Sequence, residues 1–145
     1  MMNIYFPDEE ITDNDLYFIC YMIERVARKL HQKNKYVVNT IGRDALKHLI
    51  SVANVLHCEN PLQVEDDWIE EYHLQEGDYD ITDVDRELAE IIPTPLEMGK
   101  VYKRLIIDTL QLGQRKFRCD GTDVILLCRI WRKGKGRIEI GRAHV

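Results

Sequence analysis

No apolar run in the 145-residue sequence is long enough to cross a membrane. The longest, from Leu16 to Ile23, falls far short of the roughly 20 residues that a spanning helix needs. No basic segment followed by an apolar one stands at the start, so a secretory signal is not expected. The four cysteines are scattered without a Cys-x-x-Cys spacing, which argues against a disulfide framework. We therefore expect reduced thiols and a cytoplasmic protein without a membrane partner.

Positive charge is scarce over most of the chain. Residues 1–113 hold 11 Lys and Arg against 22 Asp and Glu, a balance of −11. Residues 114–145 hold 9 against 3, a balance of +6. The acidic body argues against nucleic acid as the main partner, because phosphate contacts supply most of the non-specific affinity. The basic end would suggest a nucleic-acid-binding tail if it were native sequence.

The end of the chain, Glu139 to Val145, resembles the translation of a widely used short-read sequencing adapter. Such a segment is left out of arguments about fold. Between Phe117 and Trp131, the pair Asp120-Gly121 is a hairpin signal, although an out-of-frame segment gives similar apolar runs. We expect an acidic helical domain over residues 3–113 and a frameshifted or adapter-derived tail over residues 114–145.

Apolar residues in the acidic part recur at helical spacing, which predicts an all-α fold, a compact bundle of about five helices. The expected helices cover about residues 13–33, 44–57, 61–72, 82–92 and 95–112. The segment Tyr36 to Val38 is expected to be a short extended connector. The first helix is apolar almost all round at its start, where Tyr17, Phe18 and Tyr21 fill the outer faces. That half should lie in the centre of the core or form an interface.

Three of these helices have clear start signals. They pair Thr12 with Asp15, Asn60 with Pro61 and Gln63, and Thr94 with Pro95 and Glu97. The Thr or Asn oxygen accepts a hydrogen bond from a first-turn amide, and an acid or amide three residues on reaches back to the cap. Proline suits the first helical position, because the amide hydrogen it lacks would have no helical partner there.

Three segments are similar to a family of helical proteins from anaerobic gut bacteria. They run from Tyr5 to Arg28, from Ala53 to Pro61 and from Met98 to Ile106, and the resemblance covers about residues 3–112. It brings no known activity. It implies a place beside ADP-ribosyltransferase-like proteins in toxin–antitoxin-like gene clusters. The chain departs from the family between Gln111 and Lys116, where family members continue with further helical sequence.

The run His57-Cys58-Glu59 places a base, a nucleophile and a carboxylate next to one another, and these are the candidate catalytic residues. Neighbours on a helix point in different directions, so adjacency does not make a catalytic pair. The structural alternative is a histidine at a helix end followed by a small buried cysteine.

The acid-rich loop from Glu76 to Asp85 supplies the candidate metal ligands Asp78, Asp80, Asp83 and Asp85. Alternating carboxylates offer hard oxygen ligands to Ca²⁺ or Mg²⁺. The loop lacks the glycine and the distal glutamate of an EF-hand, and Asp83 and Asp85 are also explained as first-turn acids of a helix. The His and Cys residues show no zinc spacing, and no cofactor is expected.

Helical amphipathicity, an acidic surface and the lack of a catalytic motif favour a protein-interaction or regulatory module with a protein partner. The resemblance points to an accessory or neutralising partner in a toxin–antitoxin-like system. The alternative is an enzyme with a carboxylate and histidine site, metal-dependent or not. A weaker alternative is nucleic-acid binding by the basic run from Arg25 to Lys35. The sequence does not set the oligomeric state.

Overall fold

The computed structural model describes residues 11–113, and their side chains as far as Asp108. This part of the chain has seven helices and no strand, which confirms the all-α fold. The helices are α1 Asp13–Lys29, α2 Asn34–Ile41, α3 Arg43–Ser51, α4 Ala53–Leu56, α5 Pro61–Glu71, α6 Arg86–Ala89 and α7 Pro95–Gly113. Residues 3–10 of the expected domain, the expected tail and its hairpin signal lie outside the described residues.

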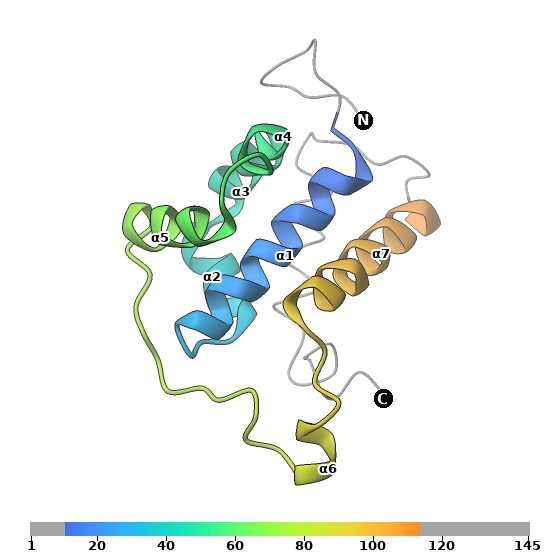
Figure 1. Cartoon of the computed structure of the whole chain (residues 1–145). Helices are drawn as coiled ribbons and strands as arrows, with labels where there is room; N and C mark the ends of the chain where they lie inside the picture. The colour runs from blue at the N-terminus through green and yellow to red at the C-terminus, as the bar shows by residue number, and fades with distance from the viewer. Residues whose placement is uncertain (1–10, 114–145) are drawn as a thin grey trace.

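Helix α1 lies at the centre of the bundle. It contacts α7 on one side and α2, α3, α4 and α5 on the others (Figure 1). Ten of its 17 residues are buried, and at about 100° per residue they cover about two thirds of the helix circumference. The remaining side carries the half-buried residues Tyr17, Tyr21, Arg25 and Arg28. A buried surface this wide has to be covered from several sides, and this requirement organises the other helices. Tyr17 and Tyr21 remain partly exposed, whereas Phe18 is buried.

The predicted capping signals are present in the structure. Thr12 and Asp15 form a reciprocal capping box at the start of α1, with Thr12 N donating to Asp15 Oδ2 at 2.8 Å. Asn60 Oδ1 accepts from Leu62 N at 3.0 Å, and Thr94 Oγ1 accepts from Glu97 N at 3.2 Å. The box expected at Gln63 does not form, because its amide donates to Asp67 instead.

Helices α1 and α5 each end in a Schellman motif with histidine in the left-handed position. His31 and His73 both have φ of 52°. Beyond His31, Gln32 N donates to Ala27 O at 2.9 Å, and beyond His73, Leu74 N donates to Ile69 O at 3.0 Å. These bonds satisfy carbonyls that the helix leaves open at its end. The motif ends α1 at Lys29, four residues before the predicted end at Lys33.

The structure corrects three predicted segments. The expected extended connector Tyr36 to Val38 is wrong, because it lies inside α2, where Val37, Val38 and Ile41 are buried. The β-branched residues suggested extended chain, but burial against the core outweighs that preference. The single helix expected over 44–57 is split at Val52 into α3 and α4. The helix expected over 82–92 is only the four-residue α6.

Two glycines shape the bundle for different reasons. Gly42, between α2 and α3, has φ of 87° and ψ of 163°, a conformation that is essentially restricted to glycine. Gly99, in α7, is buried where α7 crosses α1. A methyl group on Gly99 would lie 2.9 Å from Tyr21 Cβ and 3.0 Å from Tyr21 Cα and N. The two helix backbones can approach this closely only because residue 99 has no side chain.

We expect Gly99→Ala to lower the free energy of unfolding by about 1–2 kcal/mol. Alanine gains about 1 kcal/mol of helix propensity. Forcing α7 away from Tyr21 costs about 2–3 kcal/mol, the upper part of the usual overpacking range, because two of the contacted atoms belong to the α1 backbone and cannot rotate aside. Urea unfolding of the full chain followed by circular dichroism measures the difference. The matched control Val101→Ala changes an exposed α7 residue and should stay within about 0.5 kcal/mol of wild type. An unchanged or raised stability for Gly99→Ala would show that the helices do not meet there.

Candidate functional site

A buried ion pair lies on the C-terminal half of α1. Glu24 is only 2% exposed, and its Oε2 accepts from Arg28 Nε at 2.8 Å. Asn34 Nδ2 donates to Glu24 Oε1 at 3.4 Å and to Tyr102 Oη at 2.9 Å. Arg28 Nη2 donates to the Pro93 carbonyl at 2.6 Å. The pair thereby joins α1 to α2, to α7 and to Pro93 in the segment before α7.

A second buried carboxylate, Glu65 of α5, faces the same half of α1. It accepts from Arg25 Nε and lies 3.6 Å from Lys29 Nζ. Lys29 also donates to Asp66 at 2.8 Å, and Arg25 Nη1 donates to Tyr21 Oη at 2.8 Å. The basic run that suggested nucleic-acid binding is therefore largely committed to carboxylates of the protein itself, which leaves it less charge to offer a phosphate backbone.

Residues 75–82, called the strap, cross the loop between α1 and α2. Gly77 N donates to Leu30 O and Tyr79 N donates to His31 O, each at 2.8 Å. The Gln32 side chain donates to the Gln75 carbonyl at 3.0 Å. Both backbone acceptors lie just beyond the last turn of α1, where the left-handed residue ends the helix. The strap is thus fixed to the exit of α1.

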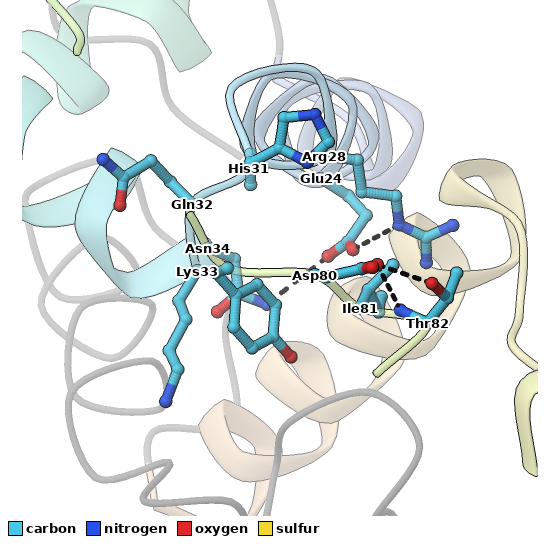
Figure 2. Close-up of a pocket in the computed structure, with 11 residues that line it drawn as sticks. Glu24, Arg28, His31, Gln32, Lys33, Asn34, Asp80, Ile81 and Thr82 are labelled. Atoms are coloured by element: carbon cyan, nitrogen blue, oxygen red, sulfur yellow. Dashed lines mark hydrogen bonds and ion pairs between the residues drawn. The ribbon is translucent and has the colours of Figure 1, made fainter. Parts of the chain in front are cut away.

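A cavity of about 200 Å³ lies between the strap and the end of α1 (Figure 2). Its lining residues come from α1, from the α1–α2 loop, from the start of α2 and from the strap. They are Glu24, Ala27, Arg28, His31, Gln32, Lys33, Asn34, Tyr79, Asp80, Ile81 and Thr82. The cavity combines a buried carboxylate, a second carboxylate, an imidazole and apolar surface in one place. We take it as the candidate ligand site.

The two carboxylates of the cavity differ in environment. Burial raises the pKa of Glu24, and the facing Arg28 guanidinium and the Asn34 amide offset this only in part. Hydrogen bonds from Thr82 lower the pKa of exposed Asp80, whose Oδ1 accepts from Thr82 N at 2.8 Å and from Thr82 Oγ1 at 2.6 Å. The nearby His31 also lowers the pKa of Asp80, in a smaller measure.

The four predicted metal ligands, Asp78, Asp80, Asp83 and Asp85, are all exposed. Within residues 11–113, no three His, Cys, Asp or Glu side chains come close enough to hold a metal ion. Asp80 lines the cavity and turns the strap through its bonds to Thr82. Asp85 directly precedes α6 but makes no side-chain cap hydrogen bond. The structure therefore brings one of the four to the candidate site.

The three predicted catalytic residues lie together after α4, and all of them are exposed. The His57 ring stacks on Phe18 with centroids 4.6 Å apart, and its Nδ1 is 3.4 Å from Asn14 Nδ2. Cys58 Sγ donates to Asn54 O at 3.5 Å. The expectation of a buried cysteine is wrong. The stacked imidazole faces α1 and so helps to hold the end of α4 against it.

The segment from 83 to 91, called the α6 arm, stands apart from the other helices (Figure 1). Helix α6 has no buried residue, and Val84, Leu88 and Ile91 are 37%, 37% and 70% exposed. The arm is anchored on both sides, because the partly buried Ile81 and Ile92 pack against the core. Val84, Leu88 and Ile91 stand at helical spacing in the sequence, but that spacing does not reveal that they lie outside the core.

The backbone hydrogen bonds that the arm makes among the described residues are all local. Asp83 N donates to Asp80 O at 3.0 Å, Leu88 N to Asp85 O at 2.8 Å and Ile91 N to Leu88 O at 3.1 Å. Local bonds of this kind hold a short turn but do not attach it to the bundle. The arm can therefore change shape without disturbing the core.

A shallow depression of about 550 Å³ lies between the start of α1 and α7. Lys100, Lys103 and Arg104 line one side of it, and Asp13 and Tyr17 line the other. The three cations share one face of α7 by their helical spacing, a signal that was present in the sequence. The groove holds both charge signs and no buried polar group marks it, so it is less defined than the cavity under the strap.

Comparisons with protein-family models, with curated proteins and with solved structures found no match for this chain. Among residues 11–113, no helix combines the length and the apolar character that crossing a membrane requires.

The two described cysteines should differ sharply in reactivity. Cys58 is exposed, whereas Cys20 is fully buried in α1 and burial raises the pKa of its thiol. The thiolate is the reactive form, so Cys20 should react only after unfolding. In a protein with Cys119 and Cys128 replaced by serine, we expect a chromogenic disulfide reagent to titrate one thiol natively and a second in urea. Adding Cys58→Ser should remove the native reaction, and persistence of that reaction would contradict the burial of Cys20.

Proposed function

We propose that this protein is a protein-interaction module that binds its partner through the α6 arm. The observation that carries the proposal is an apolar surface on an element that contributes nothing to the core. Exposed apolar groups that stabilise no fold are a recurring mark of binding surfaces. Their position on an arm with local hydrogen bonds gives a partner access to both faces of the segment.

The spacing of the apolar residues supports a particular mode of binding. Val84, Leu88 and Ile91 follow the positions i, i+4 and i+7. If the arm became helical throughout, they would form one stripe, as in peptides that dock into a groove. The present four-residue α6 supplies a starting turn for such a helix. A partner that extended this helix would bury these side chains. The favourable free energy of that burial would offset part of the cost of ordering the arm.

The acidic charges of the α6 arm favour a partner with basic groups around its binding groove. Asp83, Asp85, Glu87 and Glu90 are exposed, and Arg86 is the only cation between residues 83 and 91. An apolar groove with a rim of Lys and Arg complements this pattern, and opposite charges raise the rate of association. The resemblance of residues 3–112 suggests that this partner is a basic, toxin-like protein that the chain neutralises.

The test compares two double variants of the full chain. Leu88→Ser with Ile91→Ser removes two arm contacts, and the control Val55→Ser with Leu62→Ser removes two side chains that are 57% and 56% exposed elsewhere. Burying a Leu or Ile is worth about 1.5–3 kcal/mol, so the arm variant should bind at least about 100-fold more weakly. The control should bind like wild type, and both variants should keep the wild-type unfolding midpoint.

The measurement has two stages. A partner is first isolated from cells of the source organism with wild-type protein, and the purified partner is then titrated against each variant at low and high salt. The proposal predicts a partner whose binding weakens with salt and depends on Leu88 and Ile91. Equal affinity for the arm variant and wild type would disprove it.

An enzyme is the second candidate, because Asp80 and His31 line one cavity with the buried Glu24. A carboxylate and an imidazole are the groups that general acid–base chemistry uses most often. A thermal-shift series with Mg²⁺, Mn²⁺, Ca²⁺ and nucleotides addresses it, since a ligand that binds only the folded state raises the midpoint. A rise that survives Asp80→Asn would place the ligand elsewhere.

A further inference from the structure

Several hydrogen-bond donors around the strap cavity are already used within the described residues. Arg28 uses Nε on Glu24 and Nη2 on the Pro93 carbonyl. The backbone amides of Gly77 and Tyr79 donate to the α1–α2 loop. Thr82 donates both its amide and its hydroxyl to Asp80 Oδ1.

The acceptors of the cavity, in contrast, have unused capacity among the described residues. Asn34 is 9% exposed, and its Nδ2 makes both of its hydrogen bonds, which leaves Oδ1 without a donor. The orientation of this amide is set by Glu24, because a carboxylate can only accept. Glu24 Oε1 has one donor at 3.4 Å, and Asp80 Oδ2 has none. A buried acceptor without a donor is unfavourable unless a ligand or water supplies one.

The charge of the cavity also favours a ligand that donates hydrogen bonds. Arg28 neutralises Glu24, which leaves the charge of Asp80 without an ion-pair partner within the described residues. The Tyr79 ring already attracts a cation, since Lys33 Nζ lies 5.4 Å from its centroid. In Figure 2 the Lys33 side chain extends away from Glu24 and Arg28, so its ammonium does not occupy the space beside them.

We propose that the strap cavity binds a small organic cation, an amine or amidinium attached to an apolar group. Its N–H groups would donate to Asn34 Oδ1, Glu24 Oε1 and Asp80, and its apolar part would lie against Ala27, Ile81 and the Tyr79 ring. A cavity of about 150 Å³ holds benzene, so about 200 Å³ accepts a ring with a polar head. This site is separate from the α6 arm and does not depend on the proposed interaction function.

The first experiment uses three probes of nearly the same shape and different charge. Benzamidine is a cation, benzamide is neutral and benzoate is an anion. Each is titrated into the full chain at constant ionic strength and followed by heteronuclear NMR. Benzamidine should saturate one site with shifts at residues 24–34 and 79–82, and benzamide should bind at least tenfold more weakly. Tighter binding of benzoate, equal binding of all three or shifts elsewhere would overturn the proposal.

The second experiment uses a matched pair of variants, each of which removes one negative charge. Asp80→Asn keeps the Oδ1 acceptor for Thr82 but removes the charge at the cavity, whereas Asp83→Asn removes an exposed charge three residues further on, outside the lining. Asp80→Asn should weaken benzamidine binding about tenfold, and Asp83→Asn should leave it within twofold. If the two variants weakened benzamidine binding equally, the overall negative charge of the chain would explain the attraction of the cation. That result would refute the assigned site. Both residues are exposed, so loss of folding does not obscure the result.

Discussion

The structure depends on the burial of most of the surface of α1. Its residues Leu16, Ile19, Cys20 and Ile23 are fully inaccessible, and the buried side chains cover most of the helix circumference. Removing apolar surface from water is the main favourable contribution to folding, at about 25 cal/mol per Å². Each of the longer helices α2, α3, α5 and α7 therefore acts as one wall around α1. The missing side chain at Gly99 lets α7 pass close to the α1 backbone.

The same burial determines where polar groups can lie. Glu24 and Glu65 are inside the bundle, and each carboxylate faces a cation of α1 that reaches the surface. An unpaired buried charge would be strongly destabilising, whereas a paired one joins elements that meet at it. These pairs lie at the C-terminal half of α1, and there the strap crosses the end of the helix. The cavity lies at the C-terminal end of α1, where the apolar core borders these polar groups and the strap.

Local signals in the sequence predicted much of the bundle. Thr12 with Asp15 and Thr94 with Glu97 mark helix starts because capping depends on neighbours only. The α2 helix was missed because Val37 and Val38 favour extended chain until the core covers them. The meeting of His31 with Asp80 was also missed, since a separation of this length along the chain gives no periodic signal. The alternating acids suggested a metal loop, but Asp78 and Asp80 lie in the strap and Asp83 and Asp85 lie in the α6 arm. No three such side chains come together among the described residues.

We infer that the described chain divides into a core that opens only with the whole bundle and an α6 arm that opens alone. Native-state hydrogen exchange measures both in one experiment. Amides from Leu16 to Val26 should exchange with the free energy of global unfolding obtained from urea, and amides from 83 to 91 should show little protection. Amides of α1 that exchange well before global unfolding, or arm amides as protected as those of α1, would contradict it.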